Sequence, residues 1–436
     1  MPNSASHRTV LAIALPMILS NISQPIIGLV DTAVVGHLDA VKYLGAIAVA
    51  GAVFAFLFTI FNFLRMSATG RAAQFFGAND SAGMGRVLGQ GLALATLLGL
   101  GVIAAQWPIA DAGFRLMAAQ PAVTAEAQRY FAIRIWAAPF VLANYVLVGW
   151  FIGLHRARAA LALNLVLNLT NILLDLLFVP VLGMTTDGVA LASLLAEILA
   201  TLVGLVAAFR FMGGWRMIQQ AGRLFPLHEI MLLLRMNRDL MIRTVALMSV
   251  FMFFTAQGAR QGEVLLAANT LLLNNLSLLA FTLDGFAQAA EAMVGKVIGA
   301  GRRDQLRKVL ALTAGWSFWV ALGTAAFICV MGDGMIALLT SLPAVQGAAS
   351  VYLPWLVLTP LIAVWPFWLD GVFIGATWSS EMRNSMVAST LLFFLIWKLT
   401  RPMGNHGLWL SMILFFAVRG VTLGWTLRSK LAGETA

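Results

Sequence analysis

The sequence predicts an all-α polytopic membrane protein, with about twelve transmembrane helices in two pseudo-symmetric six-helix lobes. Three observations support this fold class: the composition, the recurrence of long apolar runs and an internal repeat. Hydrophobic residues make up 61% of the 436 residues and charged residues only 11%. Soluble domains carry about 25% charged residues. The composition therefore excludes an ordinary soluble protein.

The apolar runs have the length of transmembrane helices. A helix needs about 20 apolar residues to cross the hydrocarbon core of a bilayer. Some runs of this size are uncharged, and the others are interrupted by single charges. None shows the period-two alternation of a β-barrel. The predicted helices cover residues 9–35, 43–66, 86–110, 129–154, 158–180, 188–210, 241–261, 264–297, 307–331, 350–375, 384–400 and 405–428.

An internal repeat divides the chain into two halves. At one constant offset, 44–46 pairs with 266–268, 77–79 with 299–301, and 151–153 with 373–375, while 188–191 pairs with 407–410 at a slightly shorter offset. Six spans in each half keep both halves in the same orientation, so the repeat is parallel. We predict an amino-terminal lobe at residues 1–210, a cytoplasmic linker at 211–240 and a carboxyl-terminal lobe at 241–436.

Basic residues predict the orientation of the chain. The formal net charge is +10. With the amino terminus in the cytoplasm, 21 of the 28 Lys and Arg residues lie on the cytoplasmic side, as the positive-inside rule requires. We therefore expect both termini in the cytoplasm. We also expect a multi-pass protein of the cell membrane, and a bacterial inner membrane is favoured. The charge reflects topology and does not indicate a nucleic-acid partner. The sequence has one cysteine, Cys329, which lies within a predicted span. A single cysteine cannot form a disulfide framework within the chain.

Acidic residues inside the predicted spans are the first candidates for function. An acid at the centre of a membrane helix costs at least about 2.5–3.5 kcal/mol, so each one indicates a functional site by default. Six acids qualify: Asp31, Asp175, Glu197, Asp284, Glu291 and Asp370.

Two of these acids are predicted to share a depth in the amino-terminal half. Asp31 and Asp175 each lie near the outer end of a helix that runs outward. Asn171 shares a helix face with Asp175, Ser193 lies at a similar level, and Asn144 lies deeper. Such a cluster can bind a proton, Na⁺ or a cationic ligand. The alternatives are that Asp31 is an interfacial residue at a helix end, and that the three polar residues only bond neighbouring helices.

Five further residues are secondary cavity candidates: Gln24, Glu197, Asp284, Glu291 and Asp370. Glu197 follows Ser193 by four residues and either joins the cluster or pairs locally. Asp284 and Glu291 are two turns apart on one helix face, and Asp370 lies at a comparable depth. The alternative to a functional role is that these three acids line a solvated vestibule.

Two prolines in the first predicted helix invite a bend. Pro16 and Pro25 each remove a backbone hydrogen bond. Ordinary curvature of a helix bundle is the alternative, since Pro is common in membrane helices.

Other motifs do not support catalysis or a cofactor. Gly295-Lys296 lacks the first glycine and the Ser/Thr of a phosphate-binding loop. The five histidines show no metal-ligand spacing and lie in loops or near helix ends. We therefore expect no enzyme, no cofactor and no bound metal other than a coupling ion. If the protein is a transporter, the lack of an ATP site means that transport must draw on an ion gradient or on a partner.

Three segments resemble the multidrug and toxic compound extrusion (MATE) family. Residues 25–38, PIIGLVDTAVVGHL, resemble the family's first-helix signature, most of all that of its DinF branch. Residues 284–291, DGFAQAAE, and 369–376, LDGVFIGA, are similar to the helix 8 and helix 10 motifs of that branch. The likeness spans nearly the whole chain.

The resemblance implies a MATE/MOP-type fold with a V-shaped cavity, and export of hydrophobic or cationic compounds in exchange for H⁺ or Na⁺. It also implies that Asp31 is the principal coupling residue, surrounded by Asn144, Asn171, Asp175 and Ser193. Some other branches of the family place a Glu in helix 7, whereas residues 241–261 of this chain contain no acid. This departure puts a cation site of that type in the carboxyl-terminal lobe in doubt. A lipid-linked precursor flippase of the same superfamily and a membrane-embedded enzyme are the alternative functions.

For the coupling ion, the residues favour H⁺ over Na⁺. A single carboxylate is enough to carry a proton. Burial and a second acid nearby both favour its protonated form. Na⁺ needs several oxygen ligands, which the Asp31 and Asp175 cluster can also supply. We expect small-molecule substrates and the lipid bilayer as partners, and a monomer.

Overall fold

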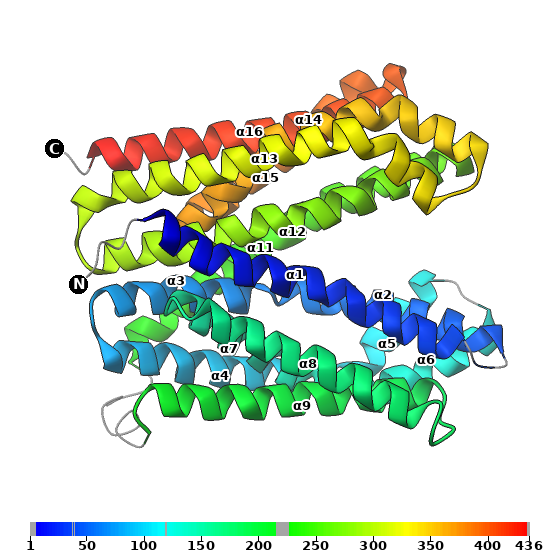
Figure 1. Cartoon of the computed structure of the whole chain (residues 1–436), viewed down its shortest axis with the longest axis horizontal. Coiled ribbons are helices and arrows are strands. Elements are labelled where there is room, and N and C mark those ends of the chain that lie inside the picture. The colour runs from blue at the N-terminus through cyan, green and yellow to red at the C-terminus, as the bar shows by residue number, and fades with distance from the viewer. Residues whose placement is uncertain (1–5, 37, 39, 118–119, 215–225, 434–436) are drawn as a thin grey trace. The chain divides into compact units, whose positions relative to one another are not determined.

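The computed structural model describes residues 6–36, 38, 40–117, 120–214 and 226–433 (Figure 1). Within these ranges the chain is helical and contains no strand. The chain folds into two compact units. The amino-terminal lobe is Leu19–Leu233, and the carboxyl-terminal lobe is Met1–Ile18 together with Leu234–Ala436. Two helices continue across the boundary: α1 (His7–Gly36) and α11 (Leu227–Arg260).

The remaining helices fall into one lobe each. The amino-terminal lobe contains α2 (Val41–Ile60), α3 (Phe63–Gly77), α4 (Ser81–Ala104), α5 (Gln106–Met117), α6 (Pro121–Arg134), η1 (Ile135–Ala137), α7 (Ala138–Gly153), α8 (Ala157–Phe178) and α9 (Thr186–Phe211). The carboxyl-terminal lobe contains α12 (Glu263–Gly299), α13 (Arg303–Leu339), α14 (Pro343–Gly375), α15 (Ser379–Thr400), η2 (Arg401–Met403) and α16 (Asn405–Gly433).

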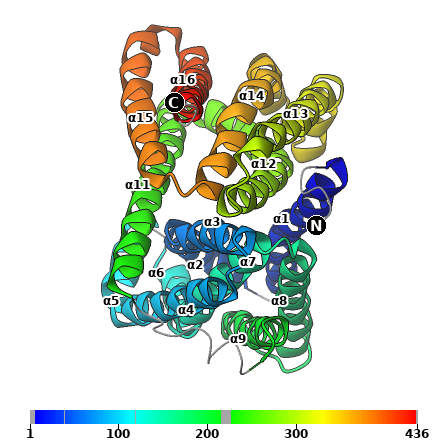
Figure 2. The ribbon, with the colours of Figure 1, turned by 90° about the vertical axis from the view of Figure 1, so that its left-hand side faces the viewer.

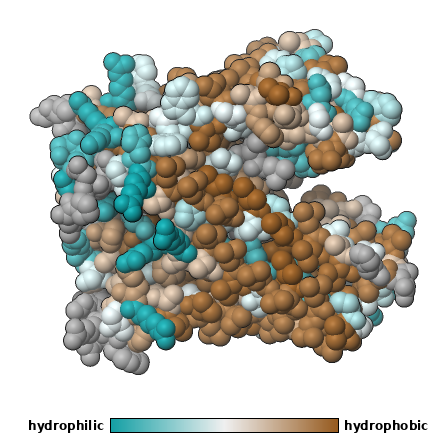
Figure 3. Space-filling model, viewed as in Figure 1, coloured by the Kyte–Doolittle hydropathy of each residue, from teal (hydrophilic) through white to brown (hydrophobic). Residues whose placement is uncertain are grey.

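Twelve helical segments of the described chain are long and apolar enough to cross a membrane. Three of them join consecutive helices: α2 with α3 over Val41–Gly77, α6 with η1 and α7 over Pro121–Gly153, and α15 with η2 over Ser379–Met403. Figure 3 shows hydrophobic side chains over the middle of each lobe, with hydrophilic side chains concentrated at one end. The predicted fold class is confirmed.

The helices extend beyond the apolar runs from which they were predicted. The predicted span at 241–261 corresponds to α11, which begins at Leu227 and so includes part of the predicted linker. Residues 215–225 of that linker lie outside the described residues. The predicted helix at 86–110 is divided at Ala105 into α4 and α5. Apolar runs mark only the part of a helix in hydrocarbon, whereas a helix continues into water wherever its backbone bonds are maintained.

The internal repeat appears in the backbone conformation of both lobes. Asn79 and Gly301 have φ of 55° and 66°, and His155 and Thr377 both have φ of 59°. Both pairs have the separation that relates the two halves of the sequence. A non-glycine residue with positive φ is uncommon. Two such turns at equivalent positions therefore show that both halves end corresponding helices in the same way.

The same offset relates the closest helix contacts within each lobe. Four glycines allow backbone contact, since a Cβ atom there would lie only 2.1–2.5 Å from a carbonyl oxygen of the facing helix. They are Gly149 against Arg65, Gly153 against Thr69, Gly371 against Ala287 and Gly375 against Glu291. The packing of α3 on α7 is thus repeated by α12 on α14, as small residues at membrane helix interfaces permit.

Candidate functional site

The candidate site begins with two carboxyl groups that face each other in the amino-terminal lobe. Asp31 on α1 is 5% exposed and Asp175 on α8 is fully buried. Their side chains lie within hydrogen-bonding reach of each other. Within the described residues, Asp31 Oδ1 and both Asp175 oxygens have no hydrogen-bond donor. Two ionised carboxylates have no hydrogen to share, so the pair needs a proton or a cation between them.

A polar stripe on α8 positions Asp175 opposite α1. Asn164, Asn168 and Asp175 follow at helical spacing on one face of α8. The Asn164 amide donates to Ser20 Oγ, and the Asn168 amide donates to Ser23 Oγ at 2.8 Å. Because these bonds fix α8 against α1, the two carboxyl groups meet further along the same interface.

The other predicted polar residues form two pairs that involve α9. Asn171 Nδ2 donates to Ser193 Oγ at 3.2 Å. Asn144 Nδ2 on α7 donates to Glu197 Oε2 at 2.6 Å. The hydroxyl of Thr201 donates to Asn144 Oδ1 at 3.2 Å. Glu197 therefore bonds with Asn144, and each of the five predicted coupling residues is buried within this lobe.

Arg134 is the residue that the acid-based prediction missed. Its guanidinium, at the end of α6, donates to the Tyr130 hydroxyl and interacts electrostatically with Asp31, Asp175 and Glu197. One cation faces three acids, so the cluster is acidic unless protons or a cation enter it. The sequence carried a signal, because Arg134 lies inside the predicted span at 129–154, where any charge deserves the same attention as an acid.

In the carboxyl-terminal lobe, Asp370 is held by two arginines. Arg243 of α11 and Arg419 of α16 both donate to Asp370 Oδ2. All three residues are buried, and Asp284 also interacts electrostatically with Arg419. The arginines satisfy the charge of Asp370, so this carboxylate differs from the Asp31 and Asp175 pair. The positive-inside rule counts Arg243 and Arg419 among the 21 basic residues of the cytoplasmic side and predicts no pairing for them.

The remaining predicted residues are Glu291, Asp284, Gln24, Pro16 and Pro25. Glu291 is buried on α12 where Gly375 approaches its backbone, and Asp284 is half-buried on the same helix. The side chain of Gln24 lies outside the described residues. Pro16 and Pro25 both lie inside α1, which continues without interruption through them.

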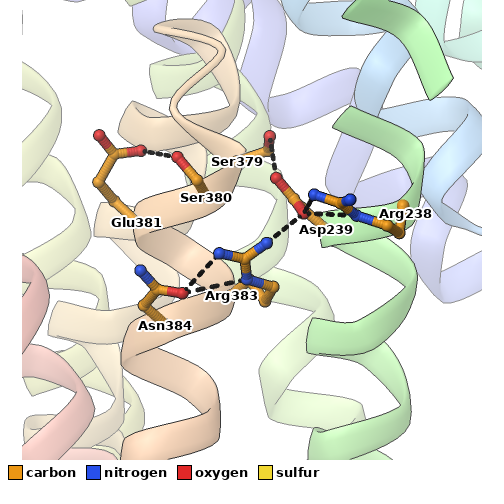
Figure 4. Close-up of polar contacts among 7 residues, drawn as sticks. All are labelled: Arg238, Asp239, Ser379, Ser380, Glu381, Arg383 and Asn384. Carbon is orange, nitrogen blue, oxygen red and sulfur yellow. Dashed lines mark hydrogen bonds and ion pairs between the residues drawn. The ribbon is translucent and has the colours of Figure 1, made fainter. Parts of the chain in front are cut away.

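A second ionic network holds α11 against α15 within the carboxyl-terminal lobe (Figure 4). Asp239 accepts hydrogen bonds from Arg383 Nη1 at 2.7 Å, from Arg238 Nη2 at 3.0 Å and from Ser379 Oγ at 3.2 Å. This network fixes the part of α11 next to Arg243. It therefore supports the position of the arginine that pairs with Asp370.

The repeat shows that the acidic cluster has no counterpart in the carboxyl-terminal lobe. At the same offsets, aromatic or aliphatic residues replace its polar ones: Asp31 corresponds to Phe253, Arg134 to Leu356, Asn171 to Phe393, Asp175 to Trp397 and Glu197 to Phe416. The Phe253 ring lies 5.8 Å from that of Phe393 and 6.3 Å from that of Trp397. The equivalent position in this lobe is therefore an apolar core.

Comparison with known proteins assigns the chain to a family. The sequence pattern of the MatE family matches residues 16–177 and 240–397. The chain belongs to the MatE family. It is 42% identical over 426 residues to DNA damage-inducible protein F of Escherichia coli (strain K12), covering 96% of this chain and 92% of that protein. It is 26% identical over 438 residues to the probable multidrug resistance protein NorM of Deinococcus radiodurans, covering 99% and 94%.

Solved MATE structures share the fold. A MATE protein in the bent conformation superposes with a TM-score of 0.89 at 20% identity, covering 98% of this chain and 95% of that one. A MOP superfamily transporter from Pyrococcus furiosus gives 0.87 at 20% identity, covering 98% and 96%. Membership of the MatE family makes this chain a multi-pass membrane transporter of small molecules rather than an enzyme.

Proposed function

We propose that the protein exports hydrophobic or cationic compounds in exchange for protons by alternating access, and that Asp31 and Asp175 couple the two movements. The observation that supports this most strongly is that these two buried carboxyl groups face each other, while Asp31 Oδ1 and both Asp175 oxygens have no hydrogen-bond donor among the described residues. A buried pair of this kind favours binding one proton, because two adjacent negative charges repel each other in a medium of low dielectric.

Exchange follows from competition for these carboxylates. When the cavity opens outward, Asp31 accepts a proton. The pair then carries one negative charge instead of two and attracts a cation less strongly, so the cation leaves. When it opens inward, the proton is lost and another cation binds. Because proton and cation exclude each other, the pair carries one or the other through each conformational change and never both. That differential binding links the two fluxes.

The ligand geometry favours H⁺ over Na⁺ in this proposal. Asn144 Oδ1 and Ser193 Oγ each already accept a hydrogen bond, from Thr201 and Asn171, respectively. A Na⁺ site needs several oxygen atoms directed at one point, whereas a proton needs only the two carboxyl groups. Exchange of one H⁺ for one monovalent cation moves no net charge. A tenfold proton gradient then supplies about 1.4 kcal/mol, enough for roughly tenfold accumulation.

The orientation in the membrane belongs to the same proposal. The excess of basic residues in the predicted cytoplasmic segments supports placing both termini in the cytoplasm of a bacterial inner membrane. We propose that the chain acts as a monomer, since the acidic cluster is assembled within one lobe of one chain.

Transport into sodium-free proteoliposomes tests the choice of ion. Purified protein is reconstituted in choline buffers, with an acidic interior and with the membrane potential clamped at zero by K⁺ and valinomycin. Ethidium added outside is expected to accumulate roughly tenfold for a tenfold proton gradient, because protons leaving the vesicle drive the cation inward.

Vesicles without a pH gradient and vesicles without protein are the controls. Uptake that requires an imposed Na⁺ gradient, and that a pH gradient alone does not produce, would show that sodium is the coupling ion.

A further inference from the structure

Each lobe carries a groove on its surface, and the two grooves occupy equivalent positions in the repeat. The α4–α9 groove has a volume of about 370 Å³ and is lined by Leu88, Gly89, Leu92, Leu205, Val206, Ala208 and Phe209. The α13–α16 groove has a volume of about 600 Å³ and lies between α13 and α16, beside α14, which packs against both helices (Figure 2). Leu88 and Leu92 correspond to Leu310 and Ala314 at the main offset of the repeat, and Leu205 corresponds to Gly424 at the shorter one.

The α13–α16 groove differs from its counterpart in size and charge. It is wider where Leu92 and Leu205 are replaced by Ala314 and Gly424. It is basic because Phe209 is replaced by Arg428.

Arg307 is the second basic side chain of the α13–α16 groove, and its equivalent in the amino-terminal lobe is Gly85. Both guanidinium groups, Arg307 and Arg428, are exposed. The described residues provide neither with an ion-pair partner.

The two arginines both lie toward one end of the groove. Arg307 lies near the start of α13 and Arg428 near the end of α16. Below them the lining is apolar, with Leu310, Leu427 and the ring of Trp368. The Trp368 indole already donates to Thr313 Oγ1 at 2.9 Å, so its ring contributes an apolar surface. The groove thus offers two anion-binding groups above a hydrocarbon-lined channel.

We propose that the α13–α16 groove binds an acidic phospholipid of the cytoplasmic leaflet, with its phosphate between Arg307 and Arg428 and an acyl chain along the apolar lining. Guanidinium groups match phosphate oxygens in charge and in hydrogen-bond geometry. Basic pockets between transmembrane helices on the cytoplasmic side bind anionic headgroups. The leaflet follows from the proposed orientation, which places the start of α13 and the end of α16 in the cytoplasm. A free anion would leave the apolar part of the groove unused.

Lipid exchange on the purified full-length protein tests the charge requirement. Protein loaded with phosphatidylglycerol is exchanged into an excess of phosphatidylcholine, and the lipid retained is measured by native mass spectrometry. Arg307→Gln and Arg428→Gln are each expected to reduce the affinity for phosphatidylglycerol about fivefold, since a basic side chain near the headgroups contributes about that factor. Lys308→Gln removes the same charge from an exposed neighbouring residue outside the groove, and we expect it to retain the lipid as the wild type does.

A second variant tests the place of the acyl chain. Gly424 has open space where a side chain would be built, and so has Gly323 on the exposed side of α13. Gly424→Leu is therefore expected to fill the groove and displace phosphatidylglycerol, whereas Gly323→Leu has no effect. Thermal unfolding in detergent micelles that contain phosphatidylcholine confirms that both variants fold.

Two outcomes would overturn the proposal: equal retention of phosphatidylglycerol in all the variants, or its displacement by millimolar inorganic phosphate. The second outcome would indicate a site for free anions. Because lipid retention is measured without transport, either outcome leaves the proposed export mechanism untouched.

Discussion

Replacing Asp31 by Asn is expected to reduce proton-driven ethidium transport to background, a loss of roughly 100-fold. The amide keeps the shape of the side chain but cannot titrate. It can also donate a hydrogen bond to Asp175, the group that faces it, and so replaces the proton that the pair lacks. The variant should therefore insert and fold normally while remaining in a state that resembles the protonated one.

The control for the Asp31 variant is Asp333→Asn. Asp333 is an exposed acid on α13 that accepts a hydrogen bond from Ser350, and its loss should leave ethidium uptake unchanged. Asp175→Asn should impair transport as well. Uptake at the wild-type rate by Asp31→Asn in the same proteoliposomes would exclude Asp31 as the coupling residue.

Replacing Asp370 by Ala is expected to destabilise the protein by about 3–5 kcal/mol, because removing one partner of a buried ionic group leaves uncompensated charge. Arg243 and Arg419 both donate to this carboxylate, and Arg419 is only 2% exposed. Two buried guanidinium groups would then repel each other without an anion between them. The midpoint of thermal unfolding in detergent should fall by several degrees.

Two comparisons separate this structural role from a direct role in ion binding. Asp333→Ala, in the same lobe, should not change the unfolding midpoint. In the double variant Asp370→Ala with Arg243→Met, one of the stranded charges is removed, so part of the stability should return. An Asp370→Ala protein with unchanged thermal stability but without transport would show instead that this carboxylate takes part in ion or substrate binding.

The apolar runs and the repeat predicted the fold, because the bilayer imposes length and hydrophobicity on each span. They did not predict the helix ends. The start of α11 at Leu227 lies in a segment with several charges, which a hydropathy pattern assigns to a loop. The sequence predicted an equal depth for Asp31 and Asp175. It could not predict that their side chains face each other, because depth alone gives neither the distance between two helices nor the side on which a residue lies.

The buried arginines show why the rest of the site could not be predicted in the same way. The positive-inside rule treats Arg134, Arg243 and Arg419 only as markers of topology. In the structure Arg243 and Arg419 pair with Asp370, and Arg134 interacts electrostatically with Asp31 and Asp175, all far away in the sequence. One signal was present in the sequence but unused. Aligning the two halves at the offset of the repeat places Asp175 opposite Trp397, which indicates directly that only one lobe keeps the acidic cluster.

The release of protons on substrate binding tests the central claim most directly. Ethidium is added to purified protein in weakly buffered, sodium-free detergent solution, and the pH change is recorded beside the amount of ligand bound. If a proton and a cation exclude each other at Asp31 and Asp175, binding releases about one proton per cation at a pH where the pair is protonated. Affinity then falls as the pH is lowered, and Asp31→Asn releases none. Binding without proton release, at an affinity independent of pH, would contradict the account.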